Sequence, residues 1–505
     1  MGIHDLQDDY HLTKSYMNYQ PGADQKFGDI ISPEFRESQK DIKVGLVSTG
    51  YFEFWHQYDA LLGKVKDDAE VVRKELSERY DLVYPGLVDT IDKAVMAGRV
   101  LREAKIDVLV LSYRTFIPDV YIHQIMHFLE DIPIIMLCSQ DRRTINWDND
   151  YCEIYRTSGI MAQVQIVAGL KKMGRYEHKL FAVAGSIFEA ETYEKLDMYI
   201  KAVRICRQLR FMTIGLIGNV FRGMCDFEFD KTKVIGGLGP EVINISIDRL
   251  EEEYNSIKDD DPEVVQMHKN VEEFYIVEGC GEEDINWACK LAVAMEHIVN
   301  RFSLDGIALL GQHFVEKLFK TEPYLGICEL QRKEICLGTT EGDVLGLIAM
   351  LILKKLTGNT AFQLEYSEFD IDRNAYLLLG HGHADPKEAR NDEAFLGAAC
   401  EHWGHQGTGV CGCFVPKPGV CTMAHFVEDT KGWRMYIHEG QILDFEPMKI
   451  NETHAIVKIK EPILEFTEKL ILAGLPHHAI TVRGDAIKEM EIVADLLGME
   501  VFRIK

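Results

Sequence analysis

The chain has 505 residues, 47% of them hydrophobic, and a formal net charge of −26 at pH 7. This length provides for two to four domains with cores of their own. The negative charge argues against nucleic acid and anionic membranes as partners, because both attract clustered basic residues. No run of roughly 18 apolar residues occurs, so no transmembrane segment is expected. The first residues predict no secretory signal, because no basic segment precedes an apolar one.

The 12 cysteines form no recognisable redox or zinc motif. Cys411 and Cys413 are separated by one residue rather than by the two of a C-x-x-C motif, and no second pair completes a zinc site. We therefore expect free thiols, most of them buried, in a protein of the reducing cytoplasm.

Residues 1–178 are predicted to form an N-terminal α/β domain. After a polar, irregular stretch up to about residue 40, short apolar strands alternate with amphipathic helices. This alternation predicts a doubly wound parallel sheet with helices on both faces. The strands are expected at 42–48, 82–84, 107–112 and 133–138, and the helices at 67–77 and 90–104.

Polar segments follow three of these strands, at the edge where ligands bind on parallel sheets. The segments are 48–51, 113–115 and 140–142. Ordinary loop composition explains each of them equally well, so they mark an edge rather than a defined site.

Residues 179–358 are predicted to form a central α/β domain of the same kind. A glycine-rich segment at 236–240 lacks the spacing of a dinucleotide-binding loop, so NAD is not expected there. The strands are expected at 180–184, 213–218, 242–247 and 306–310, and the helices at 189–208, 262–276 and 282–301.

Residues 359–505 show a different pattern, in which strands follow one another and helices nearly vanish. Turns are expected at 370–374, 416–419 and 429–432, and one short helix at 486–497. This pattern predicts an antiparallel, β-barrel-like C-terminal domain. The fold class is therefore α/β, with two doubly wound (Rossmann-like) domains followed by this β domain.

Two acidic residues 24 positions apart, Glu341 and Glu365, are the most informative pair in the chain. A helix over 341–356 carries the chain roughly 24 Å away, and an extended segment over 359–365 returns it by roughly 23 Å. If the strand runs antiparallel to the helix, the two carboxylates meet. Taken alone, Glu341 has a simpler interpretation as a stabilising acid at the helix start, with Thr340 as the cap.

Histidines strengthen the interpretation of this pair as a site. A hairpin about residue 373 places position 381 opposite Glu365, and His381 and His383 then share a face of the sheet. Of the adjacent His477 and His478, only one can point into a shared site, because neighbouring strand residues face opposite ways. Mixed carboxylate and imidazole ligands suit Mn²⁺, Co²⁺ or Fe²⁺.

At these residues the chain resembles the L-fucose isomerase and L-arabinose isomerase superfamily. The matching segments cover roughly the last third of the chain, and the α/β regions before them agree in architecture. The segments are Glu341-Gly342-Asp343, Leu356-Thr357-Gly358, Glu365, Gly382-His383-Ala384, Pro476-His477-His478 and Arg483-Gly484-Asp485. A glutamate at position 365 departs from the aspartate of typical fucose isomerases, so the chain resembles a divergent branch.

The resemblance implies three domains, a Mn²⁺ site and a homo-oligomer, hexameric or trimeric. It implies Glu341, Glu365, His383 and His478 as metal ligands, and Glu341 and Glu365 also as the catalytic acid/base pair. Which of the two is the acid, and whether His381 or His383 faces the metal, stay open.

The implied activity is a metal-dependent aldose–ketose isomerisation of a sugar through a cis-enediolate. Another enediolate reaction, such as an epimerisation or an inosose-type isomerisation, would use the same metal site. A non-catalytic sugar-binding protein is the alternative from a different class. Weaker candidates for sugar contacts lie at strand ends or carry stacking rings, although loop or core roles are as common for them: Asn219, Arg222, Gln312, His313, Trp403 and Tyr51.

Overall fold

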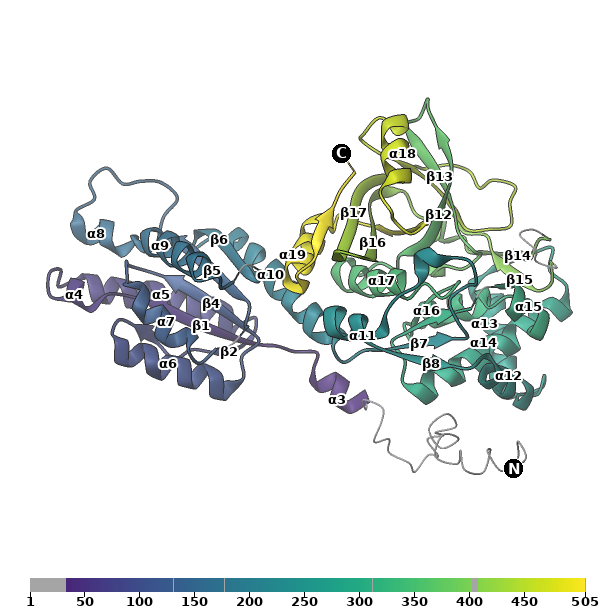
Figure 1. Cartoon of the computed structure of the whole chain (residues 1–505), viewed down its shortest axis with the longest axis horizontal. Helices are drawn as coiled ribbons and strands as arrows, with labels where there is room; N and C mark the ends of the chain where they lie inside the picture. The colour runs from purple at the N-terminus through teal and green to yellow at the C-terminus, as the bar shows by residue number, and fades with distance from the viewer. Residues whose placement is uncertain (1–32, 130, 177, 311, 402–406, 505) are drawn as a thin grey trace. The chain divides into compact units, whose positions relative to one another are not determined.

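The computed structural model describes residues 33–129, 131–176, 178–310, 312–401 and 407–504 (Figure 1). The chain divides into two compact units. The N-terminal unit comprises Ser38–Arg207 and Asp495–Gly498, and the C-terminal unit comprises, of the described residues, 33–37, Gln208–Ala494 and 499–504. The division into three domains, with boundaries at 178 and 358, stays a prediction.

The N-terminal unit contains a six-stranded sheet in which all pairings are parallel, as the sequence predicts. Its order is β2-β1-β4-β5-β6, and β3 also pairs with β1. The strands are β1 (Lys43–Thr49), β2 (Asp81–Val83), β3 (Leu87–Val88), β4 (Val108–Tyr113), β5 (Ile134–Gln140) and β6 (Leu180–Ser186).

Helices lie on both faces of this sheet. On one face, α6 (Ile91–Ala104), α7 (Asp119–Met126) and α9 (Gly159–Lys172) share an apolar cluster with alternate residues of β4. The remaining residues of β4, which alternate with these, face the opposite side of the sheet. This side carries α5 (Leu61–Ser77) and α10 (Ala190–Leu209). The short helices α4 (Phe52–Trp55) and α8 (Tyr151–Arg156) complete the unit.

The strand at 180–186 corrects one sequence interpretation. It was expected to open the second α/β unit, but β6 pairs with β5 over seven residues and so belongs to the first sheet. Strands and helices alternate in the same way before and after β6. The sequence pattern therefore does not indicate where the first sheet ends and the next begins.

The C-terminal unit begins with a second, four-stranded parallel sheet, the central sheet, in the order β11-β10-β7-β8. The three-residue strand β11 was not predicted, because it is too short to show a period. The strands are β7 (Thr213–Ile217), β8 (Glu241–Ile245), β10 (Gly306–Leu309) and β11 (Leu337–Thr339). The helices are α3 (Pro33–Ser38), α11 (Lys231–Lys233), α12 (Ile247–Ser256), α13 (Pro262–Phe274), α14 (Glu282–Phe302), α15 (Gln312–Phe319), α16 (Tyr324–Arg332) and α17 (Val344–Thr357).

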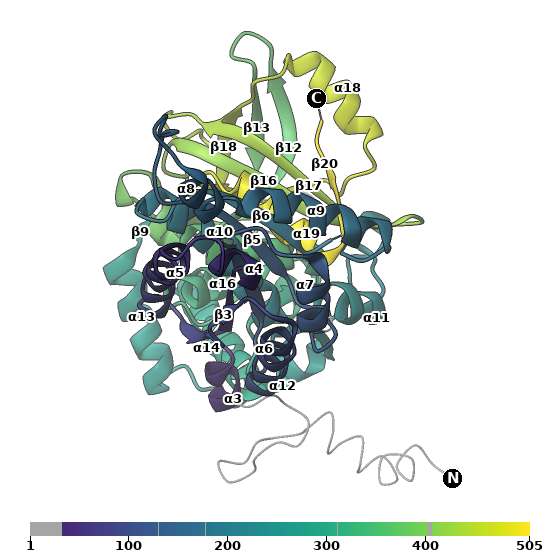
Figure 2. The same ribbon diagram turned by 90° about the vertical axis from the view of Figure 1, so that its left-hand side faces the viewer.

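The rest of this unit is a seven-stranded, mainly antiparallel sheet, the C-terminal sheet. Its order is β16-β19-β12-β13-β18-β17-β20, and β16 also pairs with β17. Figure 2 shows β12, β13 and β18 side by side. The barrel-like form stays a prediction. The strands are β12 (Phe362–Asp370), β13 (Ala375–Leu379), β16 (Gly419–Asp429), β17 (Gly432–Ile442), β18 (His454–Lys458), β19 (His478–Arg483) and β20 (Glu500–Phe502).

Two further features of this region differ from the sequence prediction or add to it. Helix α18 (Ile463–Leu472) was not predicted, whereas α19 (Ile487–Leu497) was. A small sheet joins β15 (Val410–Gly412), β14 (Phe395–Ala398) and β9 (Ile276–Glu278). In the described parts of the chain, no helix has the length and apolar character needed to cross a membrane.

Candidate metal centre

Glu341 lies in a tight connection between β11 and α17. Its φ is +63° and that of Gly342 is +75°, both in the left-handed region. Consequently, the prediction that a helix begins at Glu341 is wrong, because two left-handed residues cannot continue into a right-handed helix. Helix α17 begins at Val344, and Asp343 rather than Thr340 is its N-cap, accepting a hydrogen bond from the Gly346 amide at 2.8 Å.

Glu365 lies on β12, between strands that carry or precede the histidines. It pairs with His478 of β19 on one side and with Leu379 of β13 on the other. The predicted pairing of 365 with 381 is therefore wrong by two residues. One residue comes from the turn, which is centred between 372 and 373 rather than at 373, and the other from a register shift between Tyr366 and Glu368. Irregularities of this kind leave no clear signal in the sequence. His381 instead follows the end of β13.

Four side chains converge at this point: Glu341, Glu365, His381 and His478 offer ligand atoms that all lie within 4.8 Å of one another. The Nε2 atom of His478 lies 3.3 Å from Glu341 Oε2 and 3.7 Å from Glu365 Oε1. The Nε2 atom of His381 lies 3.6 Å from Glu341 Oε1 and pairs closely with Glu365. The structure thus brings together three of the four ligands implied by the family resemblance, with His381 as the fourth.

His383 lies outside this group of ligand atoms. It is buried, and among the described residues its Nε2 atom has no hydrogen-bond partner. Its ring lies 6.0 Å from that of Tyr324. Burial and the neighbouring charges of His381 and His478 lower the pKa of His383 to about 3. His383 is therefore a neutral imidazole beside the group.

The charges within the group reinforce one another. Burial alone would raise the pKa of each glutamate, but hydrogen bonds from the imidazoles bring the pKa values of Glu341 and Glu365 well below their usual range. Burial alone would lower the pKa of His478, but its carboxylate partners raise it well above the usual value, and Glu365 raises that of His381. These pKa directions favour ionised carboxylates beside charged imidazoles.

Asp343 fixes the orientation of His478, a role that the sequence interpretation missed. Its Oδ2 atom lies 2.8 Å from Nδ1 of His478 and 3.1 Å from Nε2 of His425. A bond from Nδ1–H to a carboxylate leaves Nε2 facing the group, the arrangement typical of metal-bound histidines. The only sequence signal, an acid two residues after Glu341, is equally typical of a helix cap, and Asp343 performs both tasks.

His477 lies at the edge of the group, between Glu341 and the further carboxylate of Asp226. Its Nδ1 atom lies 2.7 Å from Oδ2 of Asp226, and its Nε2 atom lies 3.6 Å from Glu341. Burial opposes the charged form, but Asp226 and Glu341 raise the pKa of His477 to about 9. The ring of Phe227 packs on His478 at a centroid distance of 4.4 Å. Asp226 and Phe227 carry no motif that would have identified them from the sequence.

The weaker sugar-contact candidates lie in different places. The loop that carries Asn219 and Arg222 lies against the Glu341 segment, because the Phe221 amide donates to Glu341 O at 3.0 Å, and both side chains are exposed. Gln312 and His313 begin α15. Trp403 lies outside the described residues.

Tyr51, the last of these candidates, lies in the N-terminal unit. There its ring packs edge-on against those of Phe54, at 5.2 Å, and Phe116, at 6.2 Å. An aromatic cluster therefore accounts for its position, which corresponds to the core-packing alternative.

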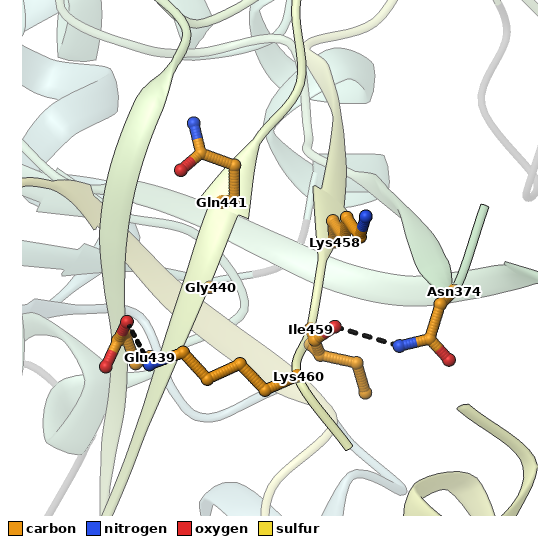
Figure 3. A pocket seen from close by; sticks show the side chains of 7 residues that line it. All are labelled: Asn374, Glu439, Gly440, Gln441, Lys458, Ile459 and Lys460. Carbon is orange, nitrogen blue, oxygen red and sulfur yellow. Dashed lines mark hydrogen bonds and ion pairs between the residues drawn. The ribbon is translucent and has the colours of Figure 1, made fainter. Parts of the chain in front are cut away.

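A pocket of about 350 Å³ opens elsewhere on the C-terminal sheet, lined by Asn374, Glu439, Gly440, Gln441, Lys458, Ile459 and Lys460 (Figure 3). Its polar groups pair with one another, since Lys460 lies 2.6 Å from Glu439 and Asn374 donates to Ile459 O at 2.8 Å. Lys458 pairs with the first residue of β13, whereas Glu365 pairs with the last, roughly 13 Å away along the strand. This pocket offers no comparable set of ligands.

Comparison with known proteins adds an enzyme class to this geometry. No family model matches the chain. It is 20% identical over 331 residues to a sulfoquinovose isomerase of Alkalicoccus urumqiensis, which covers 65% of this chain and 73% of the relative. Sulfoquinovose isomerases of Priestia aryabhattai and Priestia megaterium are each 20% identical over 326 residues, 64% of this chain and 72% of theirs. These similarities support an isomerase, and they fit the resemblance noted from the sequence only in coarse outline.

Proposed function

We propose that the chain is an aldose–ketose sugar isomerase that uses a divalent metal ion bound by Glu341, Glu365, His381 and His478. The observation that carries this proposal is the convergence of these four ligand atoms within 4.8 Å in a largely buried site. The similarity to sulfoquinovose isomerases supports a sugar as the substrate. A divergent membership of the L-fucose and L-arabinose isomerase superfamily, with a hexameric or trimeric assembly, belongs to the same proposal.

The side chains present fit such an ion. Bonds of about 2.1 Å place neighbouring ligand atoms about 3 Å apart and opposite ones about 4.2 Å apart. The distances from His478 Nε2 to the two carboxylates, 3.3 and 3.7 Å, lie between these two values. Two carboxylates with two imidazoles favour Mn²⁺, with Co²⁺ or Fe²⁺ as alternatives. When bound, the ion would stabilise negative charge that develops on the sugar oxygens.

The chemistry that follows is a proton transfer between two carbons. One carboxylate of the Glu341–Glu365 pair takes the proton from C2 of the open-chain aldose and returns it to C1, through a cis-enediolate. The hydroxyl proton passes from O2 to O1, so the aldose and ketose have the same composition. Both carboxylates are available as bases because their pKa values are held below the usual range by hydrogen bonds that overcome burial. The side chain of Glu365 is 28% exposed and that of Glu341 5%, so Glu365 lies on the side that a substrate would enter.

The test is turnover by the full-length protein with added Mn²⁺ and a panel of aldoses that includes sulfoquinovose. We expect ketose formation and incorporation of solvent deuterium into the sugar. Glu341→Gln and Glu365→Gln should each lower kcat by about 10²- to 10⁴-fold, the usual contribution of acid–base catalysis. Glu439→Gln, which alters a carboxylate of the distant pocket, is the matched control and should retain activity.

Two results would contradict the proposal. The first is the absence of both ketose and deuterium exchange with every aldose at saturating Mn²⁺. The second is full activity in either glutamine variant, because a neutral amide can neither take the C2 proton nor supply the negative charge of a carboxylate ligand.

A further inference from the structure

The carboxyl edge of the N-terminal sheet holds a buried arginine with no carboxylate partner. Arg114 directly follows β4 and is only 1% exposed. Among the residues that the structure describes, no acid lies within ion-pair distance of its guanidinium, and both of its side-chain hydrogen bonds, to the carbonyl and hydroxyl of Ser139, come from Nη2. Its Nε atom has no partner in the same part of the chain. A buried guanidinium without a carboxylate partner destabilises the fold unless another negative group compensates its charge.

The surrounding ion pairs are balanced without Arg114. Three acids and three bases beyond the strand ends pair with one another. Arg156 lies 2.6 Å from Asp68 and 2.9 Å from Asp141, Arg142 lies 2.8 Å from Glu153, and Lys64 also contacts Glu153. The guanidinium of Arg114 therefore adds one uncompensated positive charge to a neutral network. Asp68 and Asp141 are close enough to act on the pKa of Arg114, yet burial is the larger effect and lowers it.

The position of this surplus charge is where parallel sheets bind ligands, beyond the carboxyl ends of their strands. Side chains alternate along a strand, so Ser112 and Arg114 face the same side of the sheet, towards α5 and α10. The hydroxyl of Ser112 is buried and, among the described residues, has no hydrogen-bond partner either. An unpartnered guanidinium N–H and an unpartnered hydroxyl thus lie on one face of the same strand end.

We propose that Arg114 binds a small oxyanion at this edge, namely the phosphoryl, sulfonyl or carboxyl group of a small molecule. The planar fork of a guanidinium matches two oxygens of such a group, and a charged acceptor makes the strongest hydrogen bonds available to it. The hydrogen bonds to Ser139 hold the fork in place before the ligand arrives. The site lies in the N-terminal unit and does not depend on the proposed metal centre.

The experiment is calorimetric titration of the full-length protein with inorganic phosphate, methanesulfonate and acetate in separate runs. At least one should bind saturably, and the one that binds most tightly identifies the group. Arg114→Gln should weaken that binding at least tenfold. Arg143→Gln removes a surface arginine whose side chain is 77% exposed, and it should leave the affinity unchanged. No saturable binding of any of the three, or equal affinity in Arg114→Gln, would overturn the proposal.

Hydrogen exchange of the wild-type protein provides a second measurement that does not depend on the folding of a variant. The tightest-binding anion should slow exchange at the strand ends around 112–116 and 139–142. Protection confined to other segments would overturn the proposal, because the anion would then bind elsewhere.

Discussion

His478 and His297 in the C-terminal unit each lie between two glutamates, but of this pair only His478 belongs to the candidate metal centre. His478 lies between Glu341 and Glu365, and His297 of α14 lies between Glu253 and Glu263. At His478 the same nitrogen, Nε2, faces both carboxylates. At His297 the two nitrogens bond to one carboxylate each, Nδ1 at 2.9 Å and Nε2 at 2.7 Å, on opposite sides of the ring.

This difference shows that a carboxylate–imidazole cluster is not by itself a metal site. A cation needs the lone pairs of all ligands to meet at one point, which the ring of His297 prevents by standing between its partners. The Nδ1 atom of His478 is instead occupied by Asp343, and this leaves Nε2 for the shared point. Burial adds to the contrast, because the side chain of His478 is 0% exposed and that of His297 29% exposed.

The largest expected effect tests this contrast directly. His478→Gln removes the nitrogen that faces both glutamates and should weaken Mn²⁺ binding by more than about 100-fold, beyond the usual loss for a residue that only orients a ligand. His297→Gln is the matched control and should change the affinity less than about twofold. Titration of metal-stripped protein measures both. Similar losses of Mn²⁺ affinity in the two variants would contradict the distinction drawn between the two histidines.

A second pair of variants separates His381 from His383. His381 contributes a ligand atom to the group and His383 does not, so His381→Gln should weaken Mn²⁺ binding by about 100-fold. His383→Gln should change it only a few-fold, because that imidazole lies beside the group. The reverse order would show that the ligand implied by the family resemblance is the correct one. Both affinities come from the same titration.

Asp343→Asn should have a smaller effect. Asparagine caps a helix about as well as aspartate, so α17 keeps its N-cap while His478 loses the charged acceptor that orients it. We expect Mn²⁺ affinity to fall by roughly tenfold, within the range known for such outer partners. Asp370→Asn, at the last residue of β12, is the control. An unchanged affinity in Asp343→Asn would mean that His478 is oriented by packing alone.

Much of the fold was predictable because it depends on regular periods. The strands at β1, β4, β5, β7 and β10 and the helices at α6, α10, α13 and α14 follow from apolar runs and amphipathic spacing. Two of the missed features lack such a period: β11 has three residues, and the sheet change at β6 interrupts no alternation. Helix α18 was also missed, although its ten residues are long enough to show a helical period.

Most residues of the candidate site were predictable from the sequence, but their backbone conformation and strand pairing were not. The spacing of Glu341 and Glu365 predicted that their carboxylates meet, but it did so with a helix beginning at Glu341, where the backbone is left-handed. The predicted hairpin put position 381 opposite Glu365, whereas the family resemblance implied His383 as the ligand. In the structure His381 joins the group from beyond the end of β13. Asp343 and Asp226 act through contacts between segments far apart in the sequence, which no local pattern encodes.

The smallest expected effect is on the free energy of unfolding, and it tests whether His297 forms an ordinary ion pair with its two glutamates. Burial opposes the charged form, but hydrogen bonds to Glu253 and Glu263 raise the pKa of His297 above its usual value near 6.5. A raised pKa in the folded state stabilises the protein fully below the unfolded-state pKa, and the stabilisation is lost as pH rises through the folded-state pKa. Urea unfolding of wild type and His297→Gln should therefore differ by up to about 1 kcal/mol near pH 6 and progressively less above it. A difference that grows with pH would mean that His297 is held as a neutral imidazole, which two flanking carboxylates oppose.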